Sequence, residues 1–455
     1  MRVLLVRPPR IKQSIALGEF MYCEPIGLEM VFAMLEKEHQ VEILDFMAEN
    51  IKIEEKLSKY KPHIVGITSL CIDVEAVRLL TMRIKAFDKE ILTFVGGTQA
   101  FLNSETFFVE TVDHVFKYTT NENMRELFKF LSNHENPPLI NGICSRINAF
   151  KTTDRNCINE YISPNRESTA KYRKEYSYFG YKPCAIMGTA QGCEKHCSFC
   201  LRWRIEGGFI NYFSLEGVEA EIKSIKEESI MIFDNDFLHN GERLMNICDF
   251  LEKEKIKKNF ICYGSVNSIL KNKQAIKRFH EIGLQAVIVG YETFKDEELN
   301  IYNKKSNVDD NLKASLFMRE IKLDVWASFI IHPDWDKSDF KQFRSYLKLL
   351  RPQVASTSPL TPFPNLPLYE EYKDRLIIRK EDYEAWSFGQ VSIEPSRMIL
   401  QNYYYEILKT NLYINLVINN IVYMVHKFGI RRVLRLGQGS VNLLFKYIRL
   451  MVKAG

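Results

Sequence analysis

Short apolar runs alternate with helically patterned stretches over the first 130 residues of the chain. Short apolar runs predict strands at 3–9, 41–46, 63–70, 91–97 and 113–118; the first ends in prolines and the fourth in two glycines. Apolar residues at helical spacing predict helices at 25–38, 53–60, 73–88 and 123–131. This alternation predicts a parallel sheet with helices on both faces. We therefore expect a doubly wound, Rossmann-like α/β domain at residues 1–136.

The same alternation returns in the second half of the chain. Residues 137–183 are polar, irregular and broken by prolines, which favours a linker. Further strands are predicted at 185–190, 229–236, 260–266, 284–293, 323–331 and 353–362, with helices between them. Six strand–helix repeats predict a partial or full β/α barrel at 184–375. After it the strand pattern fades, and a C-terminal helical region is expected at 376–455.

Composition narrows the class of protein. The 455 residues are 46% hydrophobic and 26% charged, as in ordinary globular proteins. No apolar run is long enough to predict a transmembrane helix, and the first ten residues fit a buried strand better than a signal peptide. Ten cysteines with a single cluster favour a reducing, cytoplasmic compartment and metal or redox chemistry over a disulfide framework.

Charge is unevenly distributed. The net charge is +5, but residues 407–455 contain eight Lys or Arg and no Asp or Glu. The basic residues alternate with apolar ones, which leaves two interpretations open. The tail packs on the barrel with its basic residues toward water, or it makes peripheral contact with the inner membrane surface. Nucleic-acid binding is not expected, because no nucleic-acid-binding fold is recognisable.

Three cysteines are crowded into "GCEKHCSFC", at Cys193, Cys197 and Cys200. They follow the first strand of the predicted barrel, where such barrels carry their chemistry. Buried core thiols are one interpretation, but polar residues interleave the cysteines. A zinc site with His196 is another, but the usual paired Cys-x2-Cys arrangement is missing. Three thiolates suit a four-iron cluster with one iron left open.

The pattern Cys-x3-Cys-x-aromatic-Cys resembles the signature of the radical S-adenosylmethionine (SAM) enzymes. The resemblance implies that the three cysteines hold a [4Fe–4S] cluster, that Phe199 lies at the cofactor and that the open iron binds SAM. An electron from the cluster would cleave SAM to methionine and a 5′-deoxyadenosyl radical, which abstracts hydrogen from an unactivated carbon. A closed barrel would protect that radical from water.

Two further segments are expected near SAM. "GYET" resembles the family's Gly-x-Glu-Ser/Thr stretch, which implies that Gly290, Glu292 and Thr293 line the SAM pocket; an ordinary strand-to-loop turn is the alternative. Asp234 and Asp236 follow the second barrel strand. They are expected either to hold the SAM amino group or to cap the next helix.

The first domain resembles the cobalamin-binding domain of B12-binding radical SAM enzymes. The resemblance implies cobalamin contacts from Asp45, Thr68, Ser69, Gly96 and Gly97. Methionine, Met47, stands where the family's cobalt-ligating histidine would be. The usual histidine ligand is therefore not expected. A domain that has lost its cofactor is the alternative.

Residues 326–340 and 350–376 resemble segments of B12-binding radical SAM enzymes that modify lipids, with the hopanoid C-3 methylases nearest. The resemblance implies cobalamin-dependent methylation of an unactivated carbon in a small apolar or lipid-like substrate, with a donor such as flavodoxin or ferredoxin. Cyclisation, rearrangement or oxidoreduction without methyl transfer is the alternative activity. An iron–sulfur electron carrier or sensor without catalysis is the alternative of another class.

Overall fold

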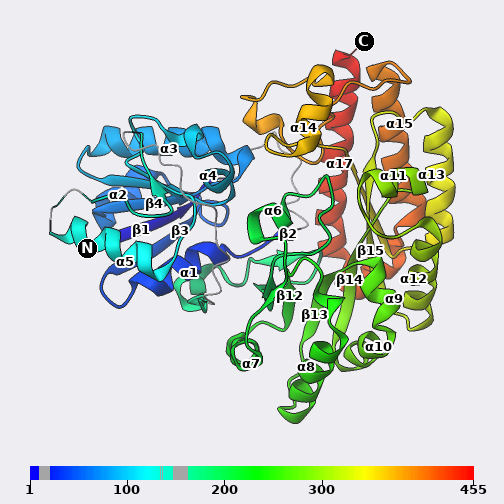
Figure 1. Cartoon of the computed structure of the whole chain (residues 1–455), viewed down its shortest axis with the longest axis horizontal. Helices are drawn as coiled ribbons and strands as arrows, with labels where there is room; N and C mark the ends of the chain where they lie inside the picture. Colours follow the sequence, from blue (N-terminus) through cyan, green and yellow to red (C-terminus); the bar gives the residue numbers. More distant parts are fainter. Residues whose placement is uncertain (10–20, 134, 136, 147–161, 455) are drawn as a thin grey trace. The chain divides into compact units, whose positions relative to one another are not determined.

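The computed structural model describes residues 1–9, 21–133, 135, 137–146 and 162–454 (Figure 1). These residues pack as two compact units, each with its own parallel sheet. The first unit takes the described residues within 1–14, 24–175 and 380–386. The second takes those within 15–23, 176–379 and 387–455. This division into packing units does not test the domain boundaries expected from the sequence, which stay a prediction.

The first unit contains a six-stranded sheet in the order β3-β1-β4-β5-β6-β7. Its strands are β1 Arg2–Arg7, β3 Gln40–Asp45, β4 Ile64–Thr68, β5 Leu92–Gly96, β6 His114–Phe116 and β7 Ile143–Cys144. All pairs are parallel except β6 with β7. Because β3 and β4 flank β1, the winding direction changes between β1 and β4. Folds with this order bind ligands beyond the carboxyl ends of the strands at that point.

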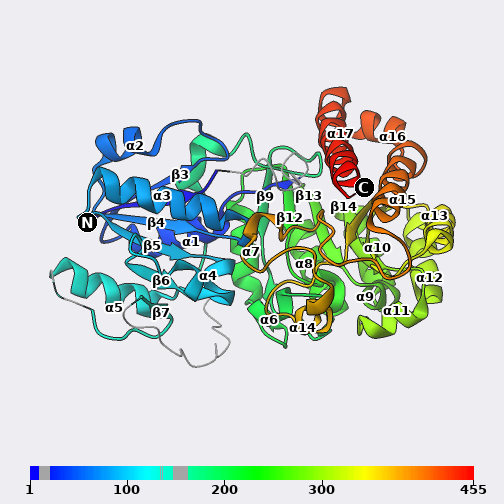
Figure 2. The same ribbon diagram turned by 90° about the horizontal axis from the view of Figure 1, so that it is seen from above.

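Helices cover both faces of this sheet (Figures 1 and 2). They are α1 Ile26–Leu35, α2 Ile53–Tyr60, α3 Val74–Phe87, α4 Thr98–Leu102 and α5 Asn121–Ser132, with short 3-10 turns η2 Cys71–Asp73 and η3 Ser104–Phe107. Successive residues of β1 face opposite sides. Leu4 and Val6 join a core with α2 and α3, whereas Val3 and Leu5 join one with α1 and α5. The expected doubly wound α/β fold is confirmed.

The stretch expected to be a linker, 137–183, contains short strands and a 3-10 segment among its described residues. Near its start, β7 extends the first sheet. A 3-10 segment, η4 Arg166–Tyr172, packs beside α1, where the Thr169 hydroxyl donates to Glu29 at 2.5 Å. Further on, β8 Ser177–Tyr178 pairs with β2 Met21–Tyr22 in the second unit. Residues 147–161 of the expected linker lie outside the described residues.

The second unit contains six parallel strands in the order β16-β15-β14-β13-β12-β9. They are β9 Cys184–Met187, β12 Ser229–Ile232, β13 Asn259–Gly264, β14 Leu284–Glu292, β15 Asp324–Ile331 and β16 Val354–Pro359. The connecting helices are α7 Leu215–Ser224, α8 Gly241–Lys253, α9 Val266–Lys271, α10 Lys273–Ile282, α11 Asp296–Ile301, α12 Val308–Glu320 and α13 Lys337–Leu350, with the 3-10 turn η5 Phe237–His239. Since β9 and β16 do not pair with each other, the expected barrel is a partial one.

The amino ends of these strands are closed by apolar side chains. Strand residues such as Met231, Ala286 and Trp326 pack with Tyr181 and Phe428 in one buried cluster. The rings of Tyr181 and Phe428 meet edge to face at 5.1 Å between centroids. Asp324, the first residue of β15, forms an ion pair with Lys427 at this end. β/α barrels usually carry their chemistry at the opposite, carboxyl ends of the strands.

The expected C-terminal helical segment is present. It comprises α14 Pro367–Tyr372, the 3-10 turns η6 Lys373–Arg375 and η7 Tyr383–Ala385, α15 Leu400–Tyr413, the π-helical turn η8 Ile414–Ile418, α16 Ile421–Phe428 and α17 Ile430–Lys453. Helix α17 packs along α15 (Figure 2), where the Tyr404 and Tyr447 rings lie 6.2 Å apart. Across the described ranges, no helix combines the length and apolar character needed to cross a membrane.

Candidate active site

The three clustered cysteines lie in a loop beyond the carboxyl end of β9. Two short antiparallel strands, β10 Ala190–Gln191 and β11 Asn211–Tyr212, close the loop at its base. Gly192 enters the loop with φ +92°, and a Cβ there would lie 1.9 Å from the carbonyl oxygen of Phe209. No side chain fits so close to a backbone atom. The path of the loop therefore requires the glycine before the first cysteine.

Hydrogen bonds from Ser198 and Trp203 fix the backbone of the loop. Ser198 donates its N–H to the carbonyl oxygen of Tyr302 and its hydroxyl to that of Ile301, both at 3.1 Å. Trp203, in the short helix α6 Arg202–Glu206, donates its indole N–H to the carbonyl oxygen of Cys197 at 3.0 Å. The backbone of the loop is thus held in place while its thiols stay available as ligands.

The thiols of Cys193, Cys197 and Cys200 are not in disulfides, and they are close enough for the charge on one to affect the others. Burial raises the pKa of all three, that of Cys197 to about 11. A thiol that resists ionisation becomes a thiolate when a metal binds it. Their closeness and the absence of disulfides among them, rather than their raised pKa values, suit the three cysteines to a metal group.

The donor set fits an iron–sulfur cluster better than a single metal ion. Within the described ranges, no three His, Cys, Asp or Glu side chains are grouped as ligands of one ion. His196, the alternative zinc ligand, brings Nε2 to 2.9 Å from the carbonyl oxygen of Gly208. A four-iron cluster binds each thiolate to a different iron, so the thiols need not converge on one point.

Lys304 was not among the expected site residues. It lies close to three that were expected: Phe199, Gly290 and Glu292. Its Nζ lies 2.6 Å from Glu292 Oε1 and 5.8 Å from the centre of the Phe199 ring. A Cβ on Gly290 would lie 2.1 Å from Glu292 Oε1 and 2.9 Å from Lys304 Nζ. Burial disfavours the lysine charge, but Glu292 raises the pKa of Lys304 above its ordinary value. Gly290 therefore leaves room for a buried ion pair beside the cysteine loop.

The two aspartates after β12 bind neighbouring strand ends. Asp234 accepts the N–H of Thr189 at 2.7 Å and its hydroxyl at 2.5 Å. Asp236 accepts the N–H of Ser265 at 2.9 Å and its hydroxyl at 2.8 Å. The alternative that their side chains cap the next helix is wrong, because Asp236 precedes η5 without a side-chain cap hydrogen bond and Asn240 caps α8. Contact of Asp234 with SAM stays a prediction.

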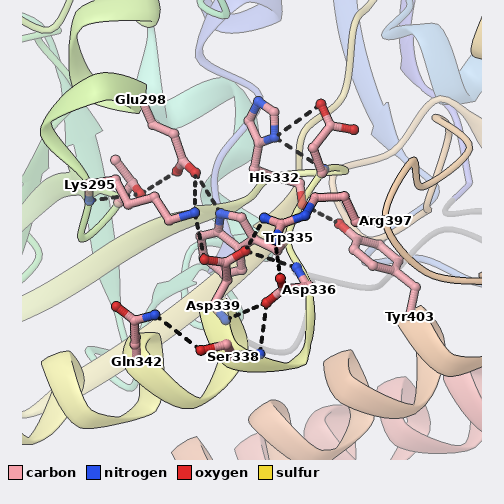
Figure 3. A network of polar contacts seen from close by, with 12 residues as sticks. Lys295, Glu298, His332, Trp335, Asp336, Ser338, Asp339, Gln342, Arg397 and Tyr403 are labelled. Atoms are coloured by element: carbon pink, nitrogen blue, oxygen red, sulfur yellow. Dashed lines mark hydrogen bonds and ion pairs between the residues drawn. The ribbon is translucent and has the colours of Figure 1, made fainter.

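A polar network lies at the carboxyl ends of β14 and β15 (Figure 3). Glu298 of α11 is buried; it accepts the indole N–H of Trp335 at 2.7 Å and the hydroxyl of Thr293. Lys295 Nζ lies 2.7 Å from Asp339 and 3.5 Å from Glu298. The Thr293 hydroxyl, expected near SAM, is thus used to hold α11.

His332 follows β15 directly and is buried beside this network. Its Nε2 lies 3.5 Å from the Tyr372 hydroxyl, and its carbonyl oxygen accepts the Tyr403 hydroxyl at 3.0 Å. Burial lowers the pKa of His332 and so favours its neutral ring. The Tyr302 ring lies 6.3 Å from that of His332 and 5.4 Å from Phe199. His332 is therefore a candidate site residue; its only sequence indication is its place at a strand end.

In the first unit, Asp45 ends β3 at the carboxyl edge of the sheet. The residue is fully buried, and its Oδ1 accepts the N–H of Met47 at 2.9 Å. Its Oδ2 lies 3.5 Å from Arg7 Nη1. Asp45 thus fixes the turn that carries the methionine standing in place of the expected histidine.

The histidines described in this unit lie at the other edge. His39 and His63 directly precede β3 and β4, and His114 begins β6. Among the described residues of the first unit, none therefore offers an imidazole at the carboxyl edge. This agrees with the expectation that the usual histidine ligand of cobalt is missing.

Thr68, Ser69, Gly96 and Gly97 meet where β4 and β5 end. Gly97 has φ +95°, and a Cβ there would lie 2.7 Å from Thr68 Oγ1 and 2.8 Å from Ser69 N. The N–H of Ser69 donates to the carbonyl oxygen of Gly96 at 2.9 Å. Glycine lets backbone or ligand approach closely where a side chain would block it. The close packing of Gly97 on Thr68 and Ser69 therefore requires glycine at this position, and contact of this edge with cobalamin stays a prediction.

A segment from far along the chain, residues 380–386, belongs to the first unit. The guanidinium of Arg78 lies 5.3 Å from the centre of the Tyr383 ring, and Cys71 donates its thiol to the Tyr383 carbonyl oxygen at 3.9 Å. The segment thus packs on η2, which begins two residues after Ser69. No local pattern indicated this contact, because the partners are more than 300 residues apart.

Family models match both halves of the chain. The radical SAM superfamily model matches residues 187–347, and the B12 binding domain model matches residues 20–126. The hopanoid C-3 methylase of Methylococcus capsulatus (strain ATCC 33009 / NCIMB 11132 / Bath) is 26% identical over 419 residues. That alignment covers 90% of this chain and 79% of the methylase.

Two solved structures share the fold. The cobalamin-dependent S-adenosylmethionine radical enzyme OxsB, with aqua-cobalamin and S-adenosylmethionine bound, has a TM-score of 0.71 at 16% identity and covers 99% of this chain and 72% of its own. The radical S-adenosylmethionine methyltransferase TsrM from Kitasatospora setae, with cobalamin and a [4Fe–4S] cluster bound, has a TM-score of 0.69 at 14% identity and covers 99% of both. The chain therefore belongs to the radical SAM enzymes that carry a B12-binding domain, whose cofactors are a [4Fe–4S] cluster, SAM and cobalamin.

Proposed function

We propose that the protein is a cobalamin-dependent methyltransferase that acts on an unactivated carbon of a small apolar or lipid-like molecule. The observation that carries the proposal is the combination, in one chain, of a loop with three available thiols and a B12-type sheet edge built on Gly97. The similarity to a hopanoid C-3 methylase over 90% of the chain supports a lipid-like acceptor.

The proposal assigns a role to each expected site residue. The cluster ligands are Cys193, Cys197 and Cys200. The SAM contacts are Phe199, Asp234, Gly290 and Glu292, and the cobalamin contacts are Asp45, Thr68, Ser69, Gly96 and Gly97. When bound, these groups would supply the electron that cleaves SAM and the methyl group that the substrate receives.

The protein's own side chains prepare the site. Lys304 is a buried cation near Cys197 and Cys200, so it reduces the cost of burying negative charge on the thiolates. The apolar closure of the barrel's amino end excludes water from one side of the radical chemistry. We further propose a cytoplasmic location, with flavodoxin or ferredoxin as electron donor and peripheral contact of the basic tail with the inner membrane surface.

Nucleoside products test the proposed reaction. The anaerobically reconstituted protein is incubated with SAM, cobalamin, reductant and a lipid extract, and the products are separated by chromatography. Methyl transfer predicts equal amounts of 5′-deoxyadenosine and S-adenosylhomocysteine, because one SAM is used for the radical and another for the methyl group. A variant with alanine at all three cluster cysteines should give neither product. A Cys248→Ala variant, which changes a buried cysteine of α8 away from the loop, should keep both.

Other outcomes identify the alternatives. Deoxyadenosine without S-adenosylhomocysteine would contradict methyl transfer and favour a rearrangement, cyclisation or oxidoreduction. A stable cluster with neither product would favour an electron carrier or sensor. Isotope from methyl-labelled SAM in the lipid fraction, identified by mass spectrometry, would reveal the substrate class.

A further inference from the structure

Exposed apolar side chains form a stripe along α17. Six large apolar residues of this helix are between 40% and 69% exposed: Ile430, Leu434, Val441, Phe445, Ile448 and Val452. Their spacings of three, four and seven residues place them within about 80° of one another around the helix axis. We call this set the α17 stripe. It runs roughly 33 Å along the helix.

The helix is held to the second unit by a different face. Leu436, Gly439 and Tyr447 are its buried residues, and Tyr447 packs on Tyr404 of α15. At 100° per residue, this buried face lies roughly 150–230° around the axis from the centre of the stripe. The α17 stripe is therefore presented by a fixed helix, and its exposure does not arise from a frayed chain end.

Basic residues follow one side of the stripe. Arg431, Arg435, Arg449 and Lys453 are exposed and lie roughly 80–120° around the axis from the stripe's centre. Within the described part of the chain, none of these four makes a hydrogen bond or ion pair, and α17 contains no acidic residue. The apolar stripe is thus bordered by unneutralised positive charge.

Apolar and basic rows side by side match the chemistry of an anionic membrane surface. A helix of this kind lies in the plane of a bilayer, with its apolar side among the acyl chains and its basic side among the headgroups. Each Lys or Arg near an anionic leaflet adds electrostatic attraction to the headgroups. A second copy of the chain would bring like charges together along the same stripe, with no acidic residue of α17 to neutralise them.

We propose that α17 docks on an anionic lipid bilayer through the α17 stripe and its basic border. This inference deepens the proposed lipid-directed function by naming the surface from which an apolar substrate would reach the enzyme. Its test requires no turnover, so its failure and the failure of methyl transfer are distinguishable.

Vesicle flotation tests the docking surface with the full-length, cluster-loaded protein. Vesicles of phosphatidylcholine alone are compared with vesicles that also contain phosphatidylglycerol, at low and high salt. Binding to the anionic vesicles is expected at low salt and should fall as salt rises, because screening weakens the charge term. A Leu434→Gln/Phe445→Gln variant should lose most binding. A Leu316→Gln/Leu349→Gln variant, with equally exposed residues on α12 and α13, should keep it.

A substitution that strengthens vesicle binding tests the surface in a way that misfolding of a variant cannot imitate. Gly437 falls on the stripe between Leu434 and Val441, and a Cβ there meets nothing within 4 Å. Gly437→Leu should fill the gap and strengthen vesicle binding about tenfold, since it adds an apolar side chain to the buried area. Arg435→Gln/Arg449→Gln should weaken binding to anionic vesicles roughly 10–30-fold.

Three results would overturn the inference. The first is no binding to either vesicle by a protein whose colour and helical circular dichroism are intact. The second is equal binding to neutral and anionic vesicles, unaffected by the arginine changes. The third is a dimer in light scattering that the Leu434→Gln/Phe445→Gln variant abolishes, in the absence of vesicle binding; this would make the stripe an interface between copies. Vesicle binding without methyl transfer would leave the inference intact and reject only the proposed reaction.

Discussion

The buried pair of Glu292 and Lys304 makes Gly290 sensitive to a single methyl group. In Gly290→Ala the new Cβ would overlap Glu292 Oε1, so the carboxylate must leave its place beside Lys304. We expect a loss of about 1–3 kcal/mol in the free energy of unfolding, as for other overpacked sites. SAM affinity should fall as well, by isothermal titration of the reconstituted protein.

Gly27→Ala is the matched control, because a Cβ on this glycine of α1 meets nothing within 4 Å. Alanine there should stabilise the helix by about 0.5–1 kcal/mol and leave SAM binding unchanged. If Gly290→Ala is destabilised but binds SAM like the wild type, Glu292 has a structural role and the proposed SAM contact is incorrect.

Asp234 should give the protein a pH-dependent stability. Burial raises its pKa to about 6, whereas an unfolded Asp titrates near its ordinary value of 3.8. A raised folded pKa means that stability is greatest below the unfolded value and falls as pH rises through about 6. In Asp234→Asn that dependence disappears, so the melting temperature of the variant relative to wild type should be higher at pH 7.5 than at pH 5. Between pH values below 3.8 and pH values above 6, this residue should lower the unfolding free energy of the wild type by about 2–3 kcal/mol in total, and only part of that change falls between pH 5 and 7.5.

The measurement is a pair of thermal melts at each pH. A difference between variant and wild type that does not change with pH would contradict the raised pKa. The same variant tests the proposed SAM contact, because an amide still accepts the Thr189 N–H but carries no charge for an ammonium group. Unchanged SAM affinity would limit Asp234 to joining β9 and β12.

How far these residues could be predicted depends on how local their contacts are. The cysteines follow one another within eight residues, so their spacing alone indicates a cluster. Lys304 lies twelve residues beyond Glu292, on the far side of α11, and its position depends on how that helix packs. Tyr383 meets Cys71 only through the path of the whole chain. Contacts between residues that are far apart in the sequence leave no periodic or spaced pattern to detect.

At the scale of elements, strands and helices followed the apolar pattern closely. Helix α2 occupies the predicted range 53–60, because its apolar face and its capping residue Lys61, in the left-handed region, define its ends locally. The strand expected at 229–236 ends at Ile232, since Asp234 and Asp236 turn away to bind neighbouring strand ends. Strand β7 was missed because two residues paired with β6 carry no alternation of their own.

The junction of β4 and β5 offers adjacent glycines with different tolerances. Gly97→Ala places a Cβ within 2.8 Å of backbone atoms of Ser69 at a positive φ, so we expect a loss of about 1–3 kcal/mol in the stability of the first unit. Cobalamin binding, followed by absorbance on titration with hydroxocobalamin, should fall with it. Gly96→Ala brings its Cβ only to 3.6 Å from Phe116, an ordinary contact, so the fold should be kept.

These two variants separate folding from cofactor contact. Loss of cobalamin affinity in a stable Gly96→Ala protein would show direct contact between this edge and the cofactor. Wild-type cobalamin affinity in both variants would contradict the proposed site.

At the scale of the whole molecule, each unit has cores of its own. The first sheet contributes to two clusters, one on each face, and the barrel sheet to two others. The chain nevertheless crosses between units more than once, because residues 380–386 return to the first unit after the barrel is complete. A linear order of domains, as inferred from alternating patterns, does not reveal such a return.

Separate cores predict that the two metal cofactors load independently. Alanine at Cys193, Cys197 and Cys200 should abolish iron and sulfide binding while cobalamin affinity stays within about twofold of wild type. Gly97→Ala should lose cobalamin affinity and keep its iron and sulfide, because changes at sites without shared partners act additively. The measurements are iron and sulfide content per chain and hydroxocobalamin titration for both variants. Loss of cobalamin binding in the triple-alanine protein would contradict independent loading and show that the two sites are coupled. Methyl transfer needs both cofactors, so it should be absent from both variants.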